Sequence, residues 1–239
     1  MEKVIVTLRG VSPDEAWCER LRTEVAGELA ATGVPGLTVN VRDAAVAGSL
    51  MTLTTLDPPV VAVVSMWTQQ YYGPQIRSAT SILAETCEQA AAYLVTESVP
   101  LEPPPTEPGL RTPGLANIAL LRRPAEMAES TWLSRWHGDH TQVAIDTQST
   151  FGYVQNTVVR PLTEDAPAVS AIVEELFPIE ATTDLHAFFG AADDADLDDR
   201  MTRMLASTAA FGADRDVDTV PTSRYVVCDP FRPAVTVQP

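Results

Sequence analysis

Two of the three histidines in the chain lie three residues apart, in the segment STWLSRWHGDHTQVAI (130–145). If this segment is a helix with about 100° per residue, Trp136 falls about 40° and His140 about 80° from Trp132. His140 then belongs to an apolar stripe, while His137, at about 140°, lies at the edge of that stripe. An imidazole on an apolar stripe needs a hydrogen-bond partner, and it titrates near neutral pH. His140 is therefore either a satisfied core residue or the acid or base of a pocket.

Other side-chain arrangements that often carry chemistry are missing from the sequence. His137 and His140 could share a metal ion, but there is no obvious third ligand, so we expect no metal site. The acidic run AADDADLDDR (191–200) lacks the glycine and the final glutamate of a calcium loop and is expected to be a solvated helix start. The three cysteines match no zinc or redox spacing and are expected to be reduced. Isolated glycines and the lack of a nucleophile elbow argue against a phosphate-binding loop and a serine hydrolase.

The charge of the chain restricts the partners it can have. It carries 32 acidic and 16 basic residues, and only one of the bases, Lys3, is a lysine. A net charge of −16 repels nucleic-acid phosphates and anionic lipid headgroups, so we expect neither nucleic acid nor a membrane as partner. No apolar run approaches the roughly 18 residues of a membrane span. The N-terminal run is too short for a signal peptide, so we expect a cytoplasmic protein.

A proline-rich segment, ESVPLEPPPTEPGLRTPG (97–114), divides the chain into two halves of similar length. We expect a stiff linker there, with one domain over 1–96 and another over 115–239. In the first half we predict strand, helix, strand, strand, helix and strand at 3–10, 13–31, 37–43, 58–67, 76–90 and 91–99. The second half repeats this order at 116–123, 129–147, 151–160, 168–177, 197–211 and 223–229, with an extra helical segment at 185–189.

The order of elements predicts the fold class. Each half reads β-α-β-β-α-β, which is the order of a ferredoxin-like unit. Such a unit has helices on one face of an antiparallel sheet and leaves the other face bare. Two units in one chain can bury these bare faces against each other. We therefore predict an α+β fold in which two ferredoxin-like units, packed sheet to sheet, form a dimeric α+β barrel within one chain, as a monomeric pseudo-dimer or a homodimer of such chains.

Residues 117–229 resemble the EthD-domain family of the dimeric α+β barrel superfamily. The resemblance rests on a proline after the first strand, a helix with tryptophan and histidine four residues apart, an aromatic strand, an acid-containing strand and a terminal strand. These features are Pro124, Trp136 with His140, FGYVQN (151–156), EELF (174–177) and SRYVV (223–227). The first half looks like a degenerate copy, because its helix has Trp17 but no histidine.

The resemblance implies a pocket between the first helix and the sheet of the second half. In this pocket His140 would move a proton, Tyr153 would donate a hydrogen bond or a proton, and Glu174 would orient His140 or act as an acid with a raised pKa. Phe151, Tyr153 and Gln155 share one side of a strand, which we expect to face the helices. The side chains expected to bind the substrate are Trp132, Trp136, His137, Phe151, Gln155, Phe177 and Tyr225. His186 is expected at the surface.

An aromatic pocket with one histidine and one tyrosine suits proton transfer on a hydrophobic small molecule that carries a carbonyl or phenol group. We therefore expect a cofactor-free acid–base enzyme of the cyclase, dehydratase, isomerase or oxygenase type. Two alternatives stay open. The chain could be a non-catalytic binding or accessory protein of a degradation or biosynthetic pathway, or a barrel that binds haem through His140.

Overall fold

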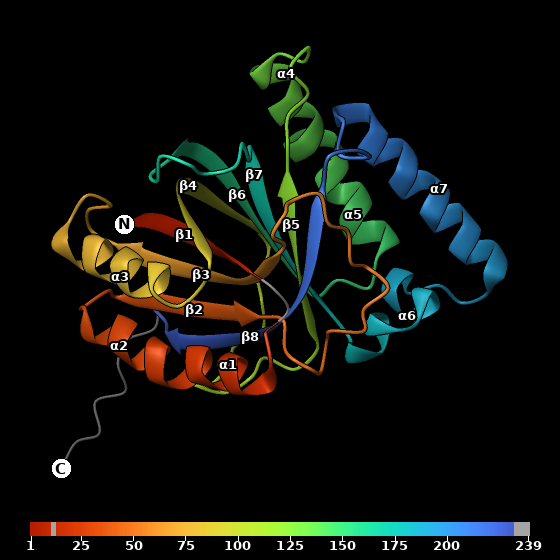
Figure 1. Cartoon of the computed structure of the whole chain (residues 1–239). Helices are drawn as coiled ribbons and strands as arrows, with labels where there is room; N and C mark the ends of the chain where they lie inside the picture. The colour runs from red at the N-terminus through yellow and green to blue at the C-terminus, as the bar shows by residue number, and fades with distance from the viewer. Residues whose placement is uncertain (11–12, 232–239) are drawn as a thin grey trace.

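Eight antiparallel strands close into a barrel, and helices pack against its outside (Figure 1). The computed structural model describes residues 1–10 and 13–231, to which all that follows applies. The strands are β1 (Glu2–Arg9), β2 (Gly36–Val41), β3 (Val60–Thr68), β4 (Gln89–Leu101), β5 (Leu115–Leu121), β6 (Gly152–Pro161), β7 (Ala171–Phe177) and β8 (Asp218–Cys228). The helical segments are α1 (Glu15–Arg20), η1 (Leu21–Val25), α2 (Ala26–Ala31), α3 (Pro74–Ala84), α4 (Glu129–Leu133), η2 (Ser134–His140), α5 (Thr141–Thr147), η3 (Ile179–Thr182), α6 (Leu185–Phe189) and α7 (Asp194–Phe211). None of these described helices is long and apolar enough to span a bilayer.

The order of the strands around the barrel is β1-β3-β2-β8-β5-β7-β6-β4. Strands of the first half are neighbours in the order β4-β1-β3-β2, and strands of the second half in the order β8-β5-β7-β6. Two pairings between the halves close the barrel, β2 with β8 and β4 with β6. We predicted that the halves pack sheet to sheet. They do not stack as two separate sheets. Their edge strands are hydrogen-bonded to each other, which removes the open edges that two stacked sheets would leave.

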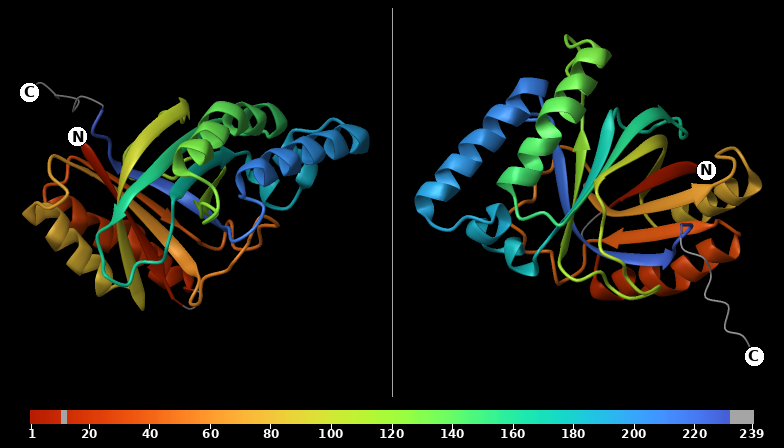
Figure 2. Two further views of the ribbon diagram at one scale, coloured as in Figure 1. Left: turned by 90° about the horizontal axis from the view of Figure 1, so that it is seen from above. Right: turned by 180° about the vertical axis from the view of Figure 1, so that it is seen from behind.

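Side chains alternate between the inside and the outside of the barrel along each strand. On the outside, the helices of the two halves cover opposite sides of the strands (Figure 2). Leu21 is part of the apolar layer of the first half, and Trp136 and Phe211 are part of that of the second half. Inside, Ile5 and Ile172 belong to an apolar core that occupies part of the barrel. The other end of the interior is lined with polar groups, described below.

The first helix of each half contains a π-helical turn. Residues 21–25 form this turn between α1 and α2, and residues 134–140 form it between α4 and α5. A π-helical turn holds more residues than an α-helical turn, so it shifts the face that later residues present. The helices predicted at 13–31 and 129–147 are therefore present, but an ideal helical wheel does not hold across 134–140.

The first part of the predicted linker is a strand. β4 continues to Leu101, and Glu97 and Ser98 pair with β6, so the irregular connection begins at Glu102. Pro100 is tolerated because the register between β4 and β6 is irregular from Ser98 to Leu101, where its missing amide hydrogen costs no ladder bond.

The rest of this connection lies along β8. The backbone N–H of Gly109 donates to Val226 O at 2.7 Å, and that of Thr112 donates to Arg224 O at 2.8 Å. The segment between the halves is thus attached to the barrel and does not act as a free spacer.

Candidate functional site

The predicted site between helix and sheet is a closely packed core. His140 is buried, its Nδ1 lies 2.9 Å from Ser207 Oγ, and its ring centroid lies 4.8 Å from that of Phe211. Burial lowers the pKa of His140 to about 4, so the ring is neutral at physiological pH. This is the environment of a histidine that is satisfied within a core.

The aromatic residues predicted around His140 are also buried there. Trp132 and Trp136 are packed against each other, with ring centroids 5.0 Å apart. Tyr153 lies on the outer face of β6, as its position in the strand predicted, and belongs to the same apolar cluster. Gln155, on the same face, donates from Nε2 to Thr141 Oγ1 at 2.8 Å. The structure thus brings these side chains together, but as a filled layer.

Glu174 does not join this group, because it faces the inside of the barrel. Its carboxylate pairs with Arg224, with Oε1 2.7 Å from Nε. The prediction that Glu174 orients His140 is therefore wrong. Neighbouring residues of a strand point to opposite faces, and the acid on the outer face is Glu175, which pairs in register with Tyr153.

Glu175 is a buried acid in the helix–sheet layer. Burial raises the pKa of its carboxyl to about 8. When the amide of Gln148 is oriented with its nitrogen inward, that nitrogen donates to Glu175 Oε1 at 3.1 Å. The sequence showed a second glutamate next to the predicted Glu174. It did not show which of the two faces the helices.

The remaining predicted contacts are dispersed. His137 is exposed and packs its ring against Trp136, with centroids 4.3 Å apart. Phe151 precedes β6, and Phe177 stacks on Phe188 at 4.3 Å in a separate cluster. Tyr225 packs on the first half, and its hydroxyl lies 3.4 Å from Asp43 Oδ2. These side chains do not surround one pocket.

His186 is at the surface, where its Nε2 lies 3.0 Å from Asp194 Oδ1. No group of three or more His, Cys, Asp or Glu side chains within residues 1–10 and 13–231 could hold a metal ion. The surroundings of His140 do not fit a haem group either, because His140 is only 6% exposed and its ring packs against Phe211.

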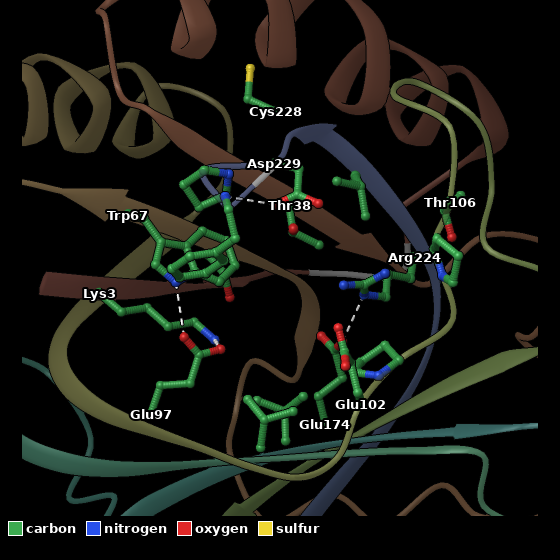
Figure 3. A pocket seen from close by; sticks show the side chains of 18 of the residues that line it. Lys3, Thr38, Trp67, Glu97, Glu102, Thr106, Glu174, Arg224, Cys228 and Asp229 are labelled. Atoms are coloured by element: carbon green, nitrogen blue, oxygen red, sulfur yellow. Dashed lines mark hydrogen bonds and ion pairs between the residues drawn. The ribbon is translucent and has the colours of Figure 1, made fainter. Parts of the chain in front are cut away.

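A cavity of about 570 Å³ lies at one end of the barrel interior (Figure 3). Strands of both halves form its wall, and the start of the connection between the halves covers part of it. It is lined by Lys3, Thr38, Ser65, Trp67, Glu97, Val99, Glu102, Pro103, Pro104, Pro105, Thr106, Val154, Glu174, Arg224, Val226, Cys228, Asp229, Pro230 and Phe231. The Cys228 sulfur points away from the other side chains in Figure 3, so this thiol does not face the cavity.

The first half contributes a partly buried ion pair to the cavity. Lys3 Nζ donates to Glu97 Oε1 at 2.9 Å, and Trp67 Nε1 donates to Glu97 Oε2 at 2.9 Å. The Lys3 ammonium also lies 4.6 Å from the centroid of the Trp67 ring. Burial lowers the pKa of Lys3, although the Glu97 carboxylate acts in the opposite direction.

The second half contributes another partly buried ion pair, between Glu174 and Arg224. Besides Arg224, Glu174 binds Asn40, whose Nδ2 donates to Glu174 Oε2 at 2.6 Å. Arg224 also donates from a terminal nitrogen to Thr112 Oγ1 at 3.2 Å. Each carboxylate has about four lone-pair sites and uses only part of them here, so both can accept further hydrogen bonds from a bound molecule.

The sequence pattern did not reveal this site because its residues are far apart along the chain. The signal that was available is a charged residue at an inward position of an otherwise apolar strand, as for Lys3 in EKVIVTLR and Glu174 in AIVEELF. Buried charges are costly unless paired, so such positions indicate partners across the barrel. The pairing could be named only once the strand order was known.

Comparisons with known proteins give the fold but no family. No protein-family model matches the sequence, and no curated protein matches it. An anthrone oxidase-like protein of known structure has a TM-score of 0.55 and 9% identity, over 98% of this chain and 97% of its own. A monooxygenase-like protein from Fusobacterium nucleatum has a TM-score of 0.48 and 9% identity, over 95% of this chain and 92% of its own. A chlorite dismutase from Candidatus Nitrospira defluvii has a TM-score of 0.47 and 10% identity, over 93% and 90%.

At such identities the likeness concerns the fold alone, and the first of these structures is the one that supports it. The neighbours belong to the dimeric α+β barrel superfamily. Over nearly its whole length, the chain therefore has the fold of a dimeric α+β barrel protein.

Proposed function

We propose that the chain binds a small molecule with an apolar body and a carbonyl or phenol group in the barrel cavity and acts on it by acid–base catalysis without a cofactor. The observation that carries this proposal is the cavity of about 570 Å³ into which two partly buried ion pairs and an indole ring project. A volume of this size is typical of small-molecule sites, and fixed polar groups in such a site orient the ligand.

Glu97 and Glu174 are the groups we assign to proton transfer. Each is held in place by two donors, so its position is fixed before a ligand arrives. A carboxylate that is fixed and partly shielded from water can accept a proton from a phenol or from carbon next to a carbonyl. Arg224 could then bind the oxygen on which negative charge develops.

We propose a supporting role for the predicted site in the helix–sheet layer. His140, Tyr153 and Glu175 lie within filled space, so they belong to the packing of this layer and do not contact the ligand. Membership of the EthD family stays a proposal that rests on the sequence pattern of residues 117–229.

We also propose that the two halves are fused ferredoxin-like units. Their strand orders, β4-β1-β3-β2 and β8-β5-β7-β6, are the same scheme, and both first helices contain a π-helical turn, which supports this proposal. Because strands of both halves line the cavity, one chain completes the site, and we propose that a monomer is sufficient.

Anthrone, a tricyclic ketone, is a suitable probe because of the name of the structural neighbour. We expect anthrone to quench the fluorescence of Trp67 and the protein to accelerate exchange of the anthrone methylene hydrogens for deuterium, measured by NMR in D2O. Trp67→Phe should lose the quenching, whereas Trp17→Phe, which alters the outer layer of the first half, should keep it.

Glu97→Gln should lower the exchange rate by about a hundredfold, while the exposed-surface variant Glu180→Gln should leave it unchanged. Circular dichroism of each variant verifies that it is folded. If anthrone binds but its exchange is no faster than in buffer, the chain is a binding protein and the enzymatic proposal is overturned. Absence of binding would overturn the cavity as the ligand site.

A further inference from the structure

The single lysine of the chain lies inside the barrel. All other basic residues are arginines, which occupy positions along the whole sequence. Lysine is usually among the most exposed residue types, yet Lys3 is only 6% exposed. The one lysine side chain of this chain therefore lies in the wall of the cavity, whereas every other basic position is an arginine.

The amine of Lys3 is accessible from the space inside the barrel. Lys3 lines the cavity of about 570 Å³ and also a second hollow of about 470 Å³ beside it, shared with Trp67, Glu97 and Phe231. The side chain projects from β1 towards Glu97, and its nitrogen lies beside the Glu97 carboxylate in Figure 3. A ligand in either hollow would lie next to this nitrogen.

An ion pair alone does not explain why this residue is a lysine. Arg224 forms the corresponding pair with Glu174 across the same cavity, which shows that a guanidinium is compatible with this interior. Arginine stays protonated in proteins and cannot act as a nucleophile, whereas a lysine can lose its proton when it is buried. The difference between the two pairs is therefore a difference in available chemistry.

We propose that Lys3 is a nucleophile that forms an imine with a carbonyl-bearing ligand in the barrel cavity, an inference that rests on the proposed function of the cavity. In the first step the Lys3 ammonium transfers a proton to Glu97. The lone pair of Nζ then attacks the carbonyl carbon, and the proton that the nitrogen loses moves to the carbonyl oxygen, which gives a neutral carbinolamine.

Glu97 returns its proton to the hydroxyl group of the carbinolamine, which leaves as water. The nitrogen lone pair forms the new C=N bond, so the products are a protonated imine, one water molecule and the Glu97 carboxylate. No electrons leave the system, and no other reactant is needed.

The groups facing Lys3 set the pH at which its amine is free. Burial favours the neutral amine, Glu97 and Glu174 favour the ammonium, and Arg224 again favours the neutral amine. Together they lower the pKa of Lys3, so more of it is nucleophilic near neutral pH than for an exposed lysine.

Reductive trapping tests this proposal directly. The full chain is incubated with 2-hydroxy-1-naphthaldehyde and sodium cyanoborohydride, which reduces an imine to a stable secondary amine, and the adduct is located by peptide mass spectrometry. We expect one adduct on Lys3 that forms faster in the folded protein than in urea. Labelling of the α-amino group alone, or of Lys3 no faster in the folded protein than in urea, would overturn the proposal.

Two variants separate nucleophilic from purely structural roles. Lys3→Arg keeps a positive charge beside Glu97 and should lose the adduct while the aldehyde still quenches Trp67. Glu97→Gln removes the carboxylate that favours the ammonium, so the pH of half-maximal labelling should fall by about one unit. An unchanged pH profile in this variant would contradict the role of Glu97, and Glu180→Gln serves as the control for the loss of one charge.

Failure of this proposal can be told apart from failure of the proposed function. If the aldehyde does not quench Trp67, the cavity is not the ligand site, and both proposals fail. If it quenches Trp67 but leaves no adduct on Lys3, the cavity stands and the imine is excluded. 2-Naphthol, which lacks the carbonyl group, should bind without forming an adduct.

Discussion

Two adjacent glutamates on β7 have opposite environments. Glu174 faces the barrel interior and is paired with Arg224 and Asn40, whereas Glu175 faces the helices and has no cation beside it. The first is a fixed carboxylate that can accept a proton from a ligand. The second is an acid that the fold keeps protonated, because burial raises its pKa from 4.5 to about 8.

This raised pKa predicts how stability depends on pH. Between pH 4.5 and about 8 the folded state binds the Glu175 proton more tightly than the unfolded state, so the free energy of unfolding falls as the pH rises through this window. We expect Glu175→Gln, which keeps the volume and stays neutral, to remove this loss. Measured by urea unfolding, the free energy of unfolding of this variant relative to wild type should rise by on the order of 3 kcal/mol from pH 5 to pH 8.

The exposed Glu180→Gln is the matched control, since it removes the same charge. The difference in the free energy of unfolding between this variant and wild type should be the same at pH 5 and at pH 8. Parallel stability curves for Glu175→Gln and wild type would contradict a buried, protonated Glu175.

At the residue scale the sequence predicted burial better than role. The stripe with Trp132, Trp136 and His140 is buried, and Tyr153 faces the helices. The roles of the two glutamates could not be distinguished because they depend on strand parity, which shifts by one face for an error of one residue. Lys3 stood out by its type, but its partner Glu97 is on a strand far along the chain.

The helix of residues 129–147 combines two α-helical parts with a π-helical turn at 134–140. Trp132 and Trp136 pack in one cluster with strand residues, whereas His140, at the end of the turn, contacts Ser207 and Phe211 of α7. Gly138 lies in this turn, and a Cβ added there would meet nothing within 4 Å.

Two changes at Gly138 should therefore have opposite effects. Gly138→Ala should stabilise the chain by about 0.5–1 kcal/mol, because alanine restricts the unfolded chain and fits the site. Deletion of Gly138 should cost about 3 kcal/mol or more, because it turns Trp132 and Trp136 away from the sheet. Both are measured by urea unfolding.

Deletion of Gly48, which lies in a turn and is also surrounded by free space, is the control for a shortened chain. It should cost much less than deletion of Gly138, because a loop absorbs the change. Equal costs for the two deletions would show that the π-helical turn has no special role in packing.

At the element scale the order of strands and helices was predictable, because hydrophobic period and proline or glycine punctuation are local signals. The end of β4 was not. We predicted a strand over 91–99 that runs into a proline-rich linker from residue 97, but β6 supplies pairing partners for residues up to Leu101. A local pattern contains no information about such a partner from the other half.

The whole molecule is closed by hydrogen bonds between its halves. β2 pairs with β8 and β4 with β6, and Gly109 and Thr112 attach the connection to β8. We expect that a chain cut between Glu107 and Pro108, in an exposed turn, stays together as one particle. Fragments 1–107 and 108–239 should elute together from a sizing column and unfold in one transition, at a lower urea concentration than the uncut chain.

Separate elution of the fragments without denaturant would contradict this view of the barrel. So would two transitions, since each half would then be stable alone. The sequence predicted two halves of similar order, but closure into one barrel depends on pairs such as Thr38 with Val226, which only the tertiary structure brings together.

The internal position of Lys3 also affects what can be attached to the molecule from outside. Amine-reactive cross-linkers, and enzymes that attach degradation tags through isopeptide bonds, need an exposed lysine. The one lysine of this chain is only 6% exposed. An amine-reactive support would therefore capture the folded chain through its α-amino group. Every immobilised copy would then have the same orientation.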